Sequence, residues 1–488
     1  MNPAGIGPTL PQGVEYVRIL PEIVLSIFGM LIMVLDPLVD ERRSQKLLGL
    51  IALTGSLVAI AAALYQSGFP GMGFWGMIKV DDFSTFFHVL VTTIAVVVIL
   101  SSYEYMETQQ IRAGEYYALI LFGAVGMCLM SSAVELVLIF IALEISSIST
   151  YVLAGFRRRA AISSEASLKY FLLGSFATAF FLYGVALMFG ATGSTSIAII
   201  SEALRLNQIP LLAYAGVAFM FVGLGFKVAA APFHVWTPDV YEGAPAPVVG
   251  FMSTAPKAAA FAVLLRLIFE VNAPGRLGLI WVTAALSMTL GNVGALVQQN
   301  VKRLLAYSSI AHAGYVLVAF AALRDNGIPA AMFYTASYAA MNVGAFAVVS
   351  HLAGAGERFV TLDDYAGLGR RSPLLAATLT IFLLSLIGIP MTGGFFAKFY
   401  VFSAALQANL IGLTIVGVLN SAVGAYYYLR IIVMMYMREA RDEGPAVIPV
   451  SPALGVALAI SLAATLYLGL LPGKILAYAA RSAADLQR

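Results

Sequence analysis

The sequence predicts an all-α, polytopic membrane protein of about fourteen transmembrane helices. The chain has 488 residues, of which 60% are hydrophobic and only 11% are charged, and its mean hydropathy is +0.90. Soluble domains carry about 25% charged residues, so the composition excludes that class. A helix needs about 20 apolar residues to cross a bilayer, and the chain contains many runs of that length.

Fourteen apolar runs meet this length criterion, and two of them are interrupted. We expect helices near 19–38, 47–66, 83–101, 115–132, 134–155, 168–191, 209–231, 248–270, 277–298, 303–322, 328–352, 374–407, 410–432 and 452–471. Proline cannot donate a backbone hydrogen bond and clashes with the preceding turn. Pro232 and Pro390 therefore predict helix breaks at Ala229–Pro232 in the seventh helix and at Gly388–Gly394 in the twelfth.

Lysines and arginines are unevenly distributed between the two sets of loops, fourteen against eight. Because positive residues are enriched in cytoplasmic loops, we expect loops after odd-numbered helices in the cytoplasm and both termini in the periplasm. The two sets are Arg42, Arg43, Lys46, Arg112, Arg157, Arg158, Arg159, Lys302, Arg303, Arg358, Arg370, Arg371, Arg438 and Arg441, against Arg18, Lys79, Arg205, Arg276, Arg324, Lys474, Arg481 and Arg488.

The interrupted helices also indicate an internal repeat. We expect residues 1–114 to form helices 1–3, 115–270 a first five-helix unit, 271–432 a second five-helix unit, and 433–488 helix 14 and a tail. An odd number of spans makes consecutive units cross the membrane in opposite directions. The fourth helix of each unit is the interrupted one, and paired interruptions are typical of an ion path in a transporter.

Residues 222–257 place charges and prolines between two apolar runs. A lysine in hydrocarbon costs about 3 kcal/mol on insertion scales. Such groups persist only where protein or a water-filled cavity satisfies them. The segment therefore predicts a broken helix beside a polar interior. It contains Lys227, His234, Asp239, Glu242 and Lys257, with Pro232, Pro238, Pro245, Pro247 and Pro256.

Three segments carry a resemblance to a known family. F-K-V-A-A-A-P-F-H-V-W-T-P-D-V-Y-E-G-A-P-A-P-V (226–248) resembles the signature of subunit N of NADH-quinone oxidoreductase, respiratory complex I. K-R-L-L-A-Y-S-S-I-A-H-A-G-Y (302–315) and G-I-P-M-T-G-G-F-F-A-K-F-Y (388–400) resemble the same family, and the resemblance covers about residues 20–472. Lys398, the T-P-D-V-Y-E-G segment and the short segment after helix 14 resemble subunit N more than its relatives M and L.

The resemblance implies a membrane subunit, similar to an antiporter, that moves protons outward while other subunits pass electrons from NADH to quinone. FMN and Fe–S clusters would belong to those subunits, and this chain would hold no cofactor or metal. The implied partners are an M-type antiporter-like subunit and small K-, J- and A-type membrane subunits. The implied location is the bacterial cytoplasmic (inner) membrane, and we expect no nucleic-acid partner.

Glu144 and Lys227 are the first candidate site residues. A carboxylate near the middle of a span usually marks a proton or ion site, and Ser147 and Tyr151 follow on the same helix face. The family implies that Glu144 pairs with Lys227 of helix 7. A change in their distance would load or release a proton on the lysine. The alternative is a permanent ion pair that only fixes the packing.

Lys257, His312 and Lys398 complete the expected proton path. In the family, the position of Lys257 belongs to a central polar axis, although its stem could also reach the membrane surface. His312 lies mid-span and can relay protons, or it could be a buried structural histidine. Lys398 lies eight residues after Pro390, and we expect it to be the counterpart of Lys227 in the second unit. Tyr334, Tyr338 and Asn342 form a polar stripe that could order water or join helices.

The remaining polar residues suggest structural roles. Glu135, Lys169, Arg266 and Arg430 lie near helix ends, where long side chains reach the interface. We expect His234, Asp239 and Glu242 to cap the ends of broken helices, with the lining of a proton entry as the alternative. We expect His88 and His351 to be structural.

Motifs for cofactors are weak. Gly71-Met72-Gly73-Phe74-Trp75-Gly76 matches G-x-G-x-x-G, but no βαβ unit surrounds it, so we expect a turn-rich loop. The single cysteine, Cys128, excludes a disulfide framework or a cysteine-ligated cluster within the chain.

The sequence is also compatible with three other functions. The chain could belong to a multi-subunit cation/proton antiporter, or to the related plastoquinone-linked complex. It could also be a structural spacer whose lysines stay in ion pairs. The co-purifying subunits distinguish the first two, and proton pumping in a Lys227 variant distinguishes the third.

Overall fold

The computed structural model describes residues 13–39, 41–112, 114–206, 211–270, 276–322, 326–439 and 449–486, without the side chains of 41–45, 269–270 and 276. Some of the charges counted for the membrane orientation lie outside the described residues. These are Arg324, Arg441 and Arg488, together with the side chains of Arg42, Arg43 and Arg276.

Within the described residues, thirteen helical segments are long and apolar enough to cross a membrane. They correspond to α2 (Leu20–Leu35), α3 (Glu41–Gln66), α4 (Asp82–Gln109), α5 (Gly114–Ser132), α6 (Leu136–Ala154), α7 (Ala161–Thr192), α9 (Leu211–Val228), α11 (Ala246–Met252) with α12 (Ala255–Glu270), α13 (Arg276–Leu296), α14 (Val301–Ala321), α15 (Ile328–Ala353), α19 (Ile411–Met437) and α20 (Pro452–Leu470). The remaining predicted span is divided into α17 (Pro373–Ile387) and α18 (Gly393–Gln407). The predicted all-α polytopic fold is confirmed.

Short elements precede, connect or follow these long helices. They are α1 (Gly13–Val17), η1 (Asp36–Leu38), β1 (Gly71–Gly73), β2 (Ile78–Val80), α8 (Ile197–Leu206), α10 (Thr237–Gly243), η3 (Ala355–Glu357), η4 (Leu362–Tyr365), α16 (Leu368–Arg371) and α21 (Pro472–Leu486). The two strands pair antiparallel, with Gly71 opposite Val80. The G-x-G-x-x-G segment therefore lies in a β-hairpin, where a turn-rich loop was predicted, and the predicted tail contains the helix α21.

Polar side chains fix where several helices begin. Asp81 Oδ1 accepts a hydrogen bond from Ser84 N at 2.7 Å, and Ser84 Oγ accepts one from Asp81 N at 3.1 Å, which forms a capping box at α4. Glu135 Oε2 accepts from Leu138 N at 2.7 Å at the start of α6. These bonds satisfy N–H groups that lack partners in a first helical turn. Glu135 is therefore a helix cap, not the surface anchor that was predicted.

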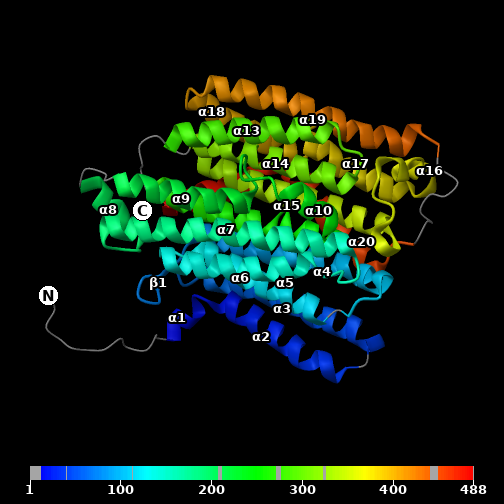
Figure 1. Cartoon of the computed structure of the whole chain (residues 1–488), viewed down its shortest axis with the longest axis horizontal. Coiled ribbons are helices and arrows are strands. Elements are labelled where there is room, and N and C mark those ends of the chain that lie inside the picture. Colours follow the sequence, from blue (N-terminus) through cyan, green and yellow to red (C-terminus); the bar gives the residue numbers. More distant parts are fainter. Residues whose placement is uncertain are drawn as a thin grey trace.

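The long helices lie side by side, and the most enclosed of them are in the middle of the bundle (Figure 1). The apolar windows of Ala246–Ile268, Val301–Ala321 and Ile328–Ala353 are 100%, 94% and 89% buried, whereas those of α2 and α19, on opposite edges, are 28% buried. Apolar groups on such edge helices are accommodated by lipid, so polar side chains can be enclosed at the centre.

Both predicted helix breaks are present. Helix α9 ends at Val228, Ala229 has a φ of 59°, and α10 begins at Thr237. Helix α17 ends at Ile387, Gly388 has a φ of 94°, and α18 begins at Gly393. Glycine adopts this left-handed region without steric cost.

A third interruption separates α11 from α12 at residues 253–254. It lies two residues before Pro256 and three before Lys257, where the proline predicts local irregularity.

The two described ends of the chain lie at the same end of the bundle. The Arg18 guanidinium donates to the carbonyls of Phe69 and Pro70, each at 3.3 Å, in the segment between α3 and α4. Near the other end of the chain, Tyr478 Oη donates to Asp82 O at 3.2 Å, and Lys79 Nζ donates to Asp485 O at 2.9 Å. A chain that crosses the membrane an even number of times must begin and end on the same side, as this chain does.

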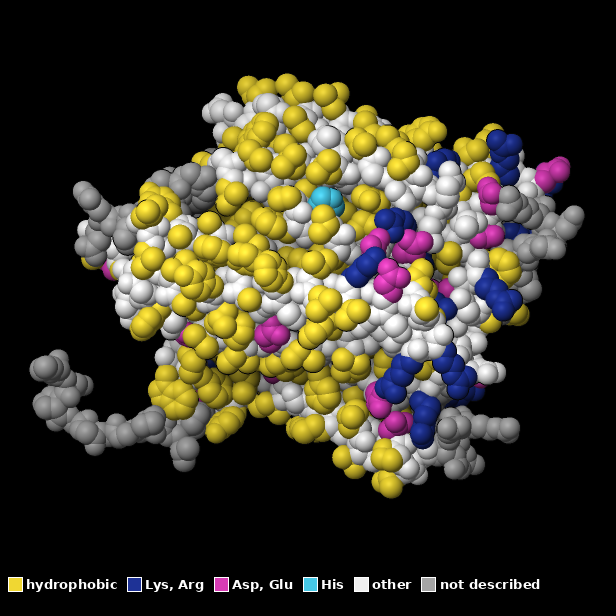
Figure 2. Space-filling model, viewed as in Figure 1, with side chains coloured by type: hydrophobic (Ala, Val, Ile, Leu, Met, Phe, Trp, Pro, Cys, Tyr) yellow, Lys and Arg dark blue, Asp and Glu magenta, His cyan; other side chains and the backbone are white. Residues whose placement is uncertain are grey.

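Charged side chains gather toward the opposite end. Figure 2 shows apolar side chains over most of the visible face and charged ones concentrated toward the end where α16 lies in Figure 1. Helix α16 carries Arg370 and Arg371 in its last turn. One charge in the orientation count is not a loop charge, because Lys302 lies in α14 and is fully buried.

Candidate functional site

Glu144 and Lys227 lie close together on α6 and α9, but they are not in direct contact. The Lys227 ammonium donates to Ser147 Oγ at 2.9 Å, and Glu144 acts on it electrostatically. No N–O contact within 4.0 Å joins Glu144 to a described cation, and Glu144 Oε1 has no hydrogen-bond partner among the described residues. Ser147 lies one turn after Glu144 on the same face. Lys227 therefore binds the serine of this face and does not contact the Glu144 carboxylate directly.

An aromatic stack holds the helix break beside Lys227. The rings of Trp236 and Tyr170 lie 4.4 Å apart at 11°, and those of Trp236 and Phe226 lie 5.1 Å apart at 28°. Trp236 Nε1 donates to Phe226 O at 3.1 Å, which satisfies a carbonyl next to the interruption. Lys227 Nζ is 6.0 Å from the centre of the Tyr170 ring, within range of a cation–π interaction. The stack thus fixes the backbone from which Lys227 extends.

Lys257 is buried on α12 and is hydrogen-bonded to α14. Its ammonium donates to Ser309 Oγ at 2.6 Å and to Ser309 O at 3.2 Å, and Tyr338 Oη also donates to Ser309 Oγ, at 2.7 Å. A cavity of about 10 Å³ lies between Lys257, His312 and Tyr338, close to the volume that one water molecule needs. Lys257 is 3% exposed, so it does not extend to the membrane surface.

His312 lies between two tyrosines. Its Nδ1 is 2.8 Å from Tyr334 Oη, and its Nε2 is 3.2 Å from Tyr428 Oη. Tyr428 also bonds to Ser308 Oγ. Hydroxyls both donate and accept, so the imidazole can hold a proton on either nitrogen.

Lys398 occupies the second break. Its ammonium donates to Leu386 O at 3.1 Å, to Ile387 O at 2.8 Å and to Ser421 Oγ at 2.8 Å. The two carbonyls are at the end of α17, where helical C=O groups lack partners and carry partial negative charge. Lys398 Nζ is 5.0 Å from the Tyr315 ring. Lys398 follows its break, whereas Lys227 precedes its own, so the two lysines are not equivalent in position.

The five predicted site residues therefore form two groups. Glu144 and Lys227 lie together, and Lys257, His312 and Lys398 surround a second polar region. The Tyr241 hydroxyl is buried between them, near Ser309, Tyr338 and Tyr170, and it has no hydrogen-bond partner among the described residues. Sequence reasoning missed four members of this network, because serine and tyrosine in apolar helices carry no distinctive pattern. They are Tyr170, Tyr241, Ser309 and Tyr428.

Asp239 and Glu242 have a different role from the predicted helix capping. Asp239 pairs with Lys169 and with Arg303, each at 2.7 Å, and Glu242 pairs with Arg303 at 2.8 Å. Burial raises the pKa of Asp239, but the Lys169 and Arg303 contacts outweigh it and hold the pKa below its usual value. This ion network joins α7, α10 and α14. Burial lowers the pKa of His234, which lies in the break.

A buried ion cluster joins α4, α11, α14 and the segment before α7 through Glu357. Its Oε2 binds Lys302 Nζ at 2.7 Å and Arg157 Nη1 at 2.9 Å. Its Oε1 accepts from Tyr105 Oη and from Ala246 N, each at 2.8 Å. Burial raises the pKa of Glu357, but the two cations outweigh burial and hold the pKa below its usual value. No sequence pattern predicted this cluster, because its members are far apart in the chain.

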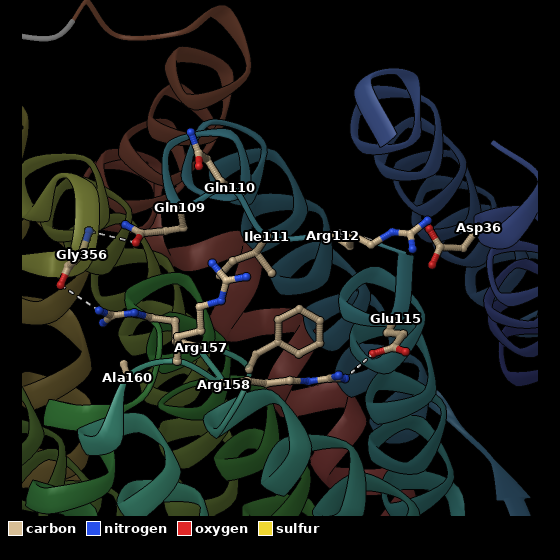
Figure 3. Close-up of a pocket in the computed structure, with 12 residues that line it drawn as sticks. Asp36, Gln109, Gln110, Ile111, Arg112, Glu115, Arg157, Arg158, Ala160 and Gly356 are labelled. Carbon is tan, nitrogen blue, oxygen red and sulfur yellow. Dashed lines mark hydrogen bonds and ion pairs between the residues drawn. The ribbon is translucent and has the colours of Figure 1, made fainter. Parts of the chain in front are cut away.

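The largest cavity described, about 600 Å³, is separate from the predicted path. Figure 3 shows Arg157 directed at Gly356 and Arg158 directed at Glu115 at its wall. None of the five predicted site residues lines it. Within the described residues, no cluster of three or more His, Cys, Asp or Glu side chains is arranged to hold a metal ion.

Two arginines predicted as surface anchors make interior contacts. Arg266 is fully buried, with Nη2 at 2.9 and 3.0 Å from the Asp81 oxygens and Nε donating to Ser131 O at 3.1 Å. Arg430 Nη1 donates to Leu296 O at 3.2 Å, at the end of α13. Lys169 is 41% exposed, about two turns after the start of α7. His351 Nδ1 lies 2.5 Å from Glu104 Oε1.

Comparisons with known proteins identify the family. The family model "NADH:quinone oxidoreductase/Mrp antiporter, TM" matches residues 133–424. The chain is 67% identical over 484 residues to NADH-quinone oxidoreductase subunit N 2 of Koribacter versatilis, which covers 97% of this chain and 98% of that protein. It is 46% identical over 470 residues to NADH-quinone oxidoreductase subunit N of Trichlorobacter lovleyi, with 94% and 95% covered.

Solved structures agree with this result. A chain of respiratory complex I from Thermus thermophilus with bound Aureothin superposes with a TM-score of 0.80 at 38% identity, covering 94% of this chain and 98% of that one. A chain of the Mrp complex from Dietzia sp. gives a TM-score of 0.84 at 21% identity, covering 96% and 97%, which shows the fold alone. From the identity, the coverage and the matched residues, the chain belongs to the NADH-quinone oxidoreductase subunit N family.

Proposed function

We propose that this chain is a proton-translocating subunit in the membrane arm of a bacterial NADH-quinone oxidoreductase. The observation that carries the proposal is the series of titratable groups enclosed within apolar spans. Lys227, Lys257, His312 and Lys398 are buried inside the bundle and Glu144 is half-buried on α6, and the neighbours of the buried groups are mostly serine and tyrosine hydroxyls. Ionisable groups inside a membrane are costly and usually functional.

The proposed step begins at Glu144 and Lys227. In the arrangement described, the lysine binds Ser147 and the carboxylate has no cation within 4.0 Å. Movement of the ammonium toward Glu144 would favour the charged lysine, and return to Ser147 would favour release of the proton. The Tyr241 hydroxyl lies between this pair and the Ser309 hydroxyl that binds Lys257, and the proposed path would pass it. His312 and Lys398 would pass the proton onward.

The two five-helix units remain part of the proposal. Residues 115–270 and 271–432 would form inverted units, because each contains a helix interrupted beside a buried lysine. Residues 1–114 and 433–488 would flank them. Breaks at corresponding helices are the sequence feature expected of such transporters.

In the proposed complex, electron transfer takes place in other subunits. NADH, FMN, Fe–S clusters and quinone would bind there, with no cofactor in this chain. The partners would be an M-type antiporter-like subunit and small K-, J- and A-type membrane subunits. The chain would lie in the cytoplasmic membrane with both termini periplasmic, which the charge-rich opposite end supports.

The principal alternative is a subunit of a multi-subunit cation/proton antiporter. Its support is the fold shared with the Mrp complex chain, which by itself does not indicate function. Purification of the native assembly and identification of its co-subunits would distinguish the two functions.

The test of pumping uses variants of the assembled complex. Lys227→Ala removes the proton carrier, and Lys227→Arg keeps a charge that cannot be released at any working pH. Glu144→Gln keeps the size but removes the charge. All three should assemble on a native gel and lose proton translocation in vesicles together with much of the coupled quinone reduction. Lys474→Ala, at an exposed position on α21, is the control. Full pumping by assembled Lys227→Ala would overturn the proposal.

A further inference from the structure

A second titratable pair lies in the N-terminal helices, outside the proposed path. Glu22 is on α2 and His88 is on α4, and their exposed fractions are 4% and 0%. His88 Nε2 is 3.5 Å from Glu22 Oε1. Gln66 at the end of α3 and Cys128 on α5 complete the surroundings of the imidazole. Four helices therefore enclose one carboxyl group and one imidazole.

The Glu22 carboxyl has no other polar contact. Neither of its oxygens accepts a hydrogen bond from another described residue. A buried carboxylate without a partner costs several kcal/mol. The group must therefore be protonated or be balanced by a charge on His88.

Both nitrogens of His88 face hydrogen-bond acceptors. Nδ1 is 3.0 Å from Gln66 Oε1, and Nε2 is 3.0 Å from the Cys128 carbonyl oxygen. The Gln66 amide orientation is fixed, because its Nε2 donates to Arg18 O. A neutral imidazole carries one N–H and can satisfy only one of the two acceptors. A second proton satisfies both, and Glu22 then supplies the balancing charge.

The other charges near the pair nearly cancel. Asp81 and Arg266 act on His88 with opposite signs and are themselves an ion pair. Lys79 Nζ lies 3.8 Å from Asp81 Oδ2, and the Lys79 side chain is 26% exposed. The Cys128 thiol lies near Glu22. The protonation of the pair is therefore set mainly by Glu22 and His88 themselves.

We propose that Glu22 and His88 form a second proton-binding site, in which one proton is held by a carboxylate–imidazolium pair. Release of that proton would leave a buried carboxylate without a balancing charge, so the pair holds the proton tightly. Gln66 also contacts the backbone of Arg18, so the site lies beside the end of the bundle where α3 and α4 meet. Use of this proton during turnover rests on the proposed function, but the existence of the site does not.

Carbodiimide labelling of the assembled complex in native membranes tests the site. The reagent reacts with protonated carboxyl groups in apolar surroundings, and peptide mass spectrometry measures the adduct at Glu22. With His88 present, Glu22 is ionised at neutral pH and labels weakly, and its labelling rises as the pH falls. In the His88→Gln variant the Glu22 carboxyl no longer has the imidazole as a base beside it, so it must be protonated and neutral. Its labelling should rise at least fivefold at neutral pH and lose its pH dependence.

Glu144 in the same digest is the internal control, and its labelling should not change. Infrared spectroscopy supplies a measurement that does not depend on reagent access. A protonated-carboxyl band should appear in His88→Gln and be absent from the Glu22→Gln/His88→Gln double variant. Unchanged Glu22 labelling, or no such band, would overturn the site. Neither readout requires turnover, so failure of the Lys227 pumping test would leave this result standing.

Discussion

Replacing Glu357 by Gln should destabilise the chain strongly. The substitution keeps the size and leaves one oxygen to accept from Tyr105 and Ala246 N. The amide NH₂ would then face Lys302 and Arg157, so two bonds to cations would become contacts between donors. The Lys302 side chain is 1% exposed, so water cannot replace the lost charge.

The expected loss follows from these contacts. A hydrogen bond to a charged group contributes about 1.5–3 kcal/mol, and removing one partner of a buried ion pair costs about 3–5 kcal/mol. We therefore expect Glu357→Gln to reduce the apparent stability by about 3–5 kcal/mol. Lys302 still donates to Ala244 O at 2.6 Å, which limits the loss.

Thermal unfolding of the detergent-solubilised complex provides the assay. The midpoint should fall clearly for Glu357→Gln and much less for Glu115→Gln, whose ion pair with Arg158 is exposed. The double variant Glu357→Gln/Lys302→Met removes the uncompensated ammonium, so it should be more stable than the sum of the single changes predicts. An unchanged midpoint in Glu357→Gln, or additive effects in the double variant, would refute the reasoning.

Three further predictions follow from other contacts and from the charge distribution. The pKa of Glu357 lies below its usual value of 4.5. The stability that the ionised Glu357 contributes is therefore present above pH 4.5 and is lost as the pH falls through the lowered pKa. In that acidic range the thermal midpoint of the parent chain should drop, and the midpoint of Glu357→Gln should drop less. Tyr428→Phe removes the hydroxyl between Ser308 and His312, and coupled quinone reduction should slow several-fold while native gels show normal assembly; an unchanged rate would exclude Tyr428 from the path. A reporter fused to the C-terminus should give a periplasmic signal; a cytoplasmic signal would contradict the orientation.

Much of the fold was predictable because membrane helices have a strong local signal. Length and apolarity located the spans, and proline and glycine located both breaks. The missed elements lack that signal: α21 is short and partly polar, and the β-hairpin consists of two strands of three residues each. The spacing also placed Lys398 after its break, on α18, and Lys227 before its own, on α9.

The site was predictable only where a residue is unusual in an apolar helix. Glu144, Lys227 and Lys257 are conspicuous for that reason. Arg266 and Lys302 were misjudged because their partners, Asp81 and Glu357, are far away in the chain. Proximity to a helix end indicates surface exposure only when no distant countercharge packs against the side chain.

The aromatic stack around Trp236 limits how Lys227 can move. The rings of Tyr170 on α7, Phe226 on α9 and Trp236 all stack on one another, and the indole donates a hydrogen bond to the Phe226 carbonyl. Translation of the α9 backbone would have to unstack three rings at once. The four-carbon side chain of Lys227 is therefore the part that can move most easily at this point. Glu144 and Ser147 are one turn apart on α6, with about 5–6 Å between their Cβ atoms. Rotamer changes of Lys227 alone can carry its ammonium group over that distance, from Ser147 to Glu144.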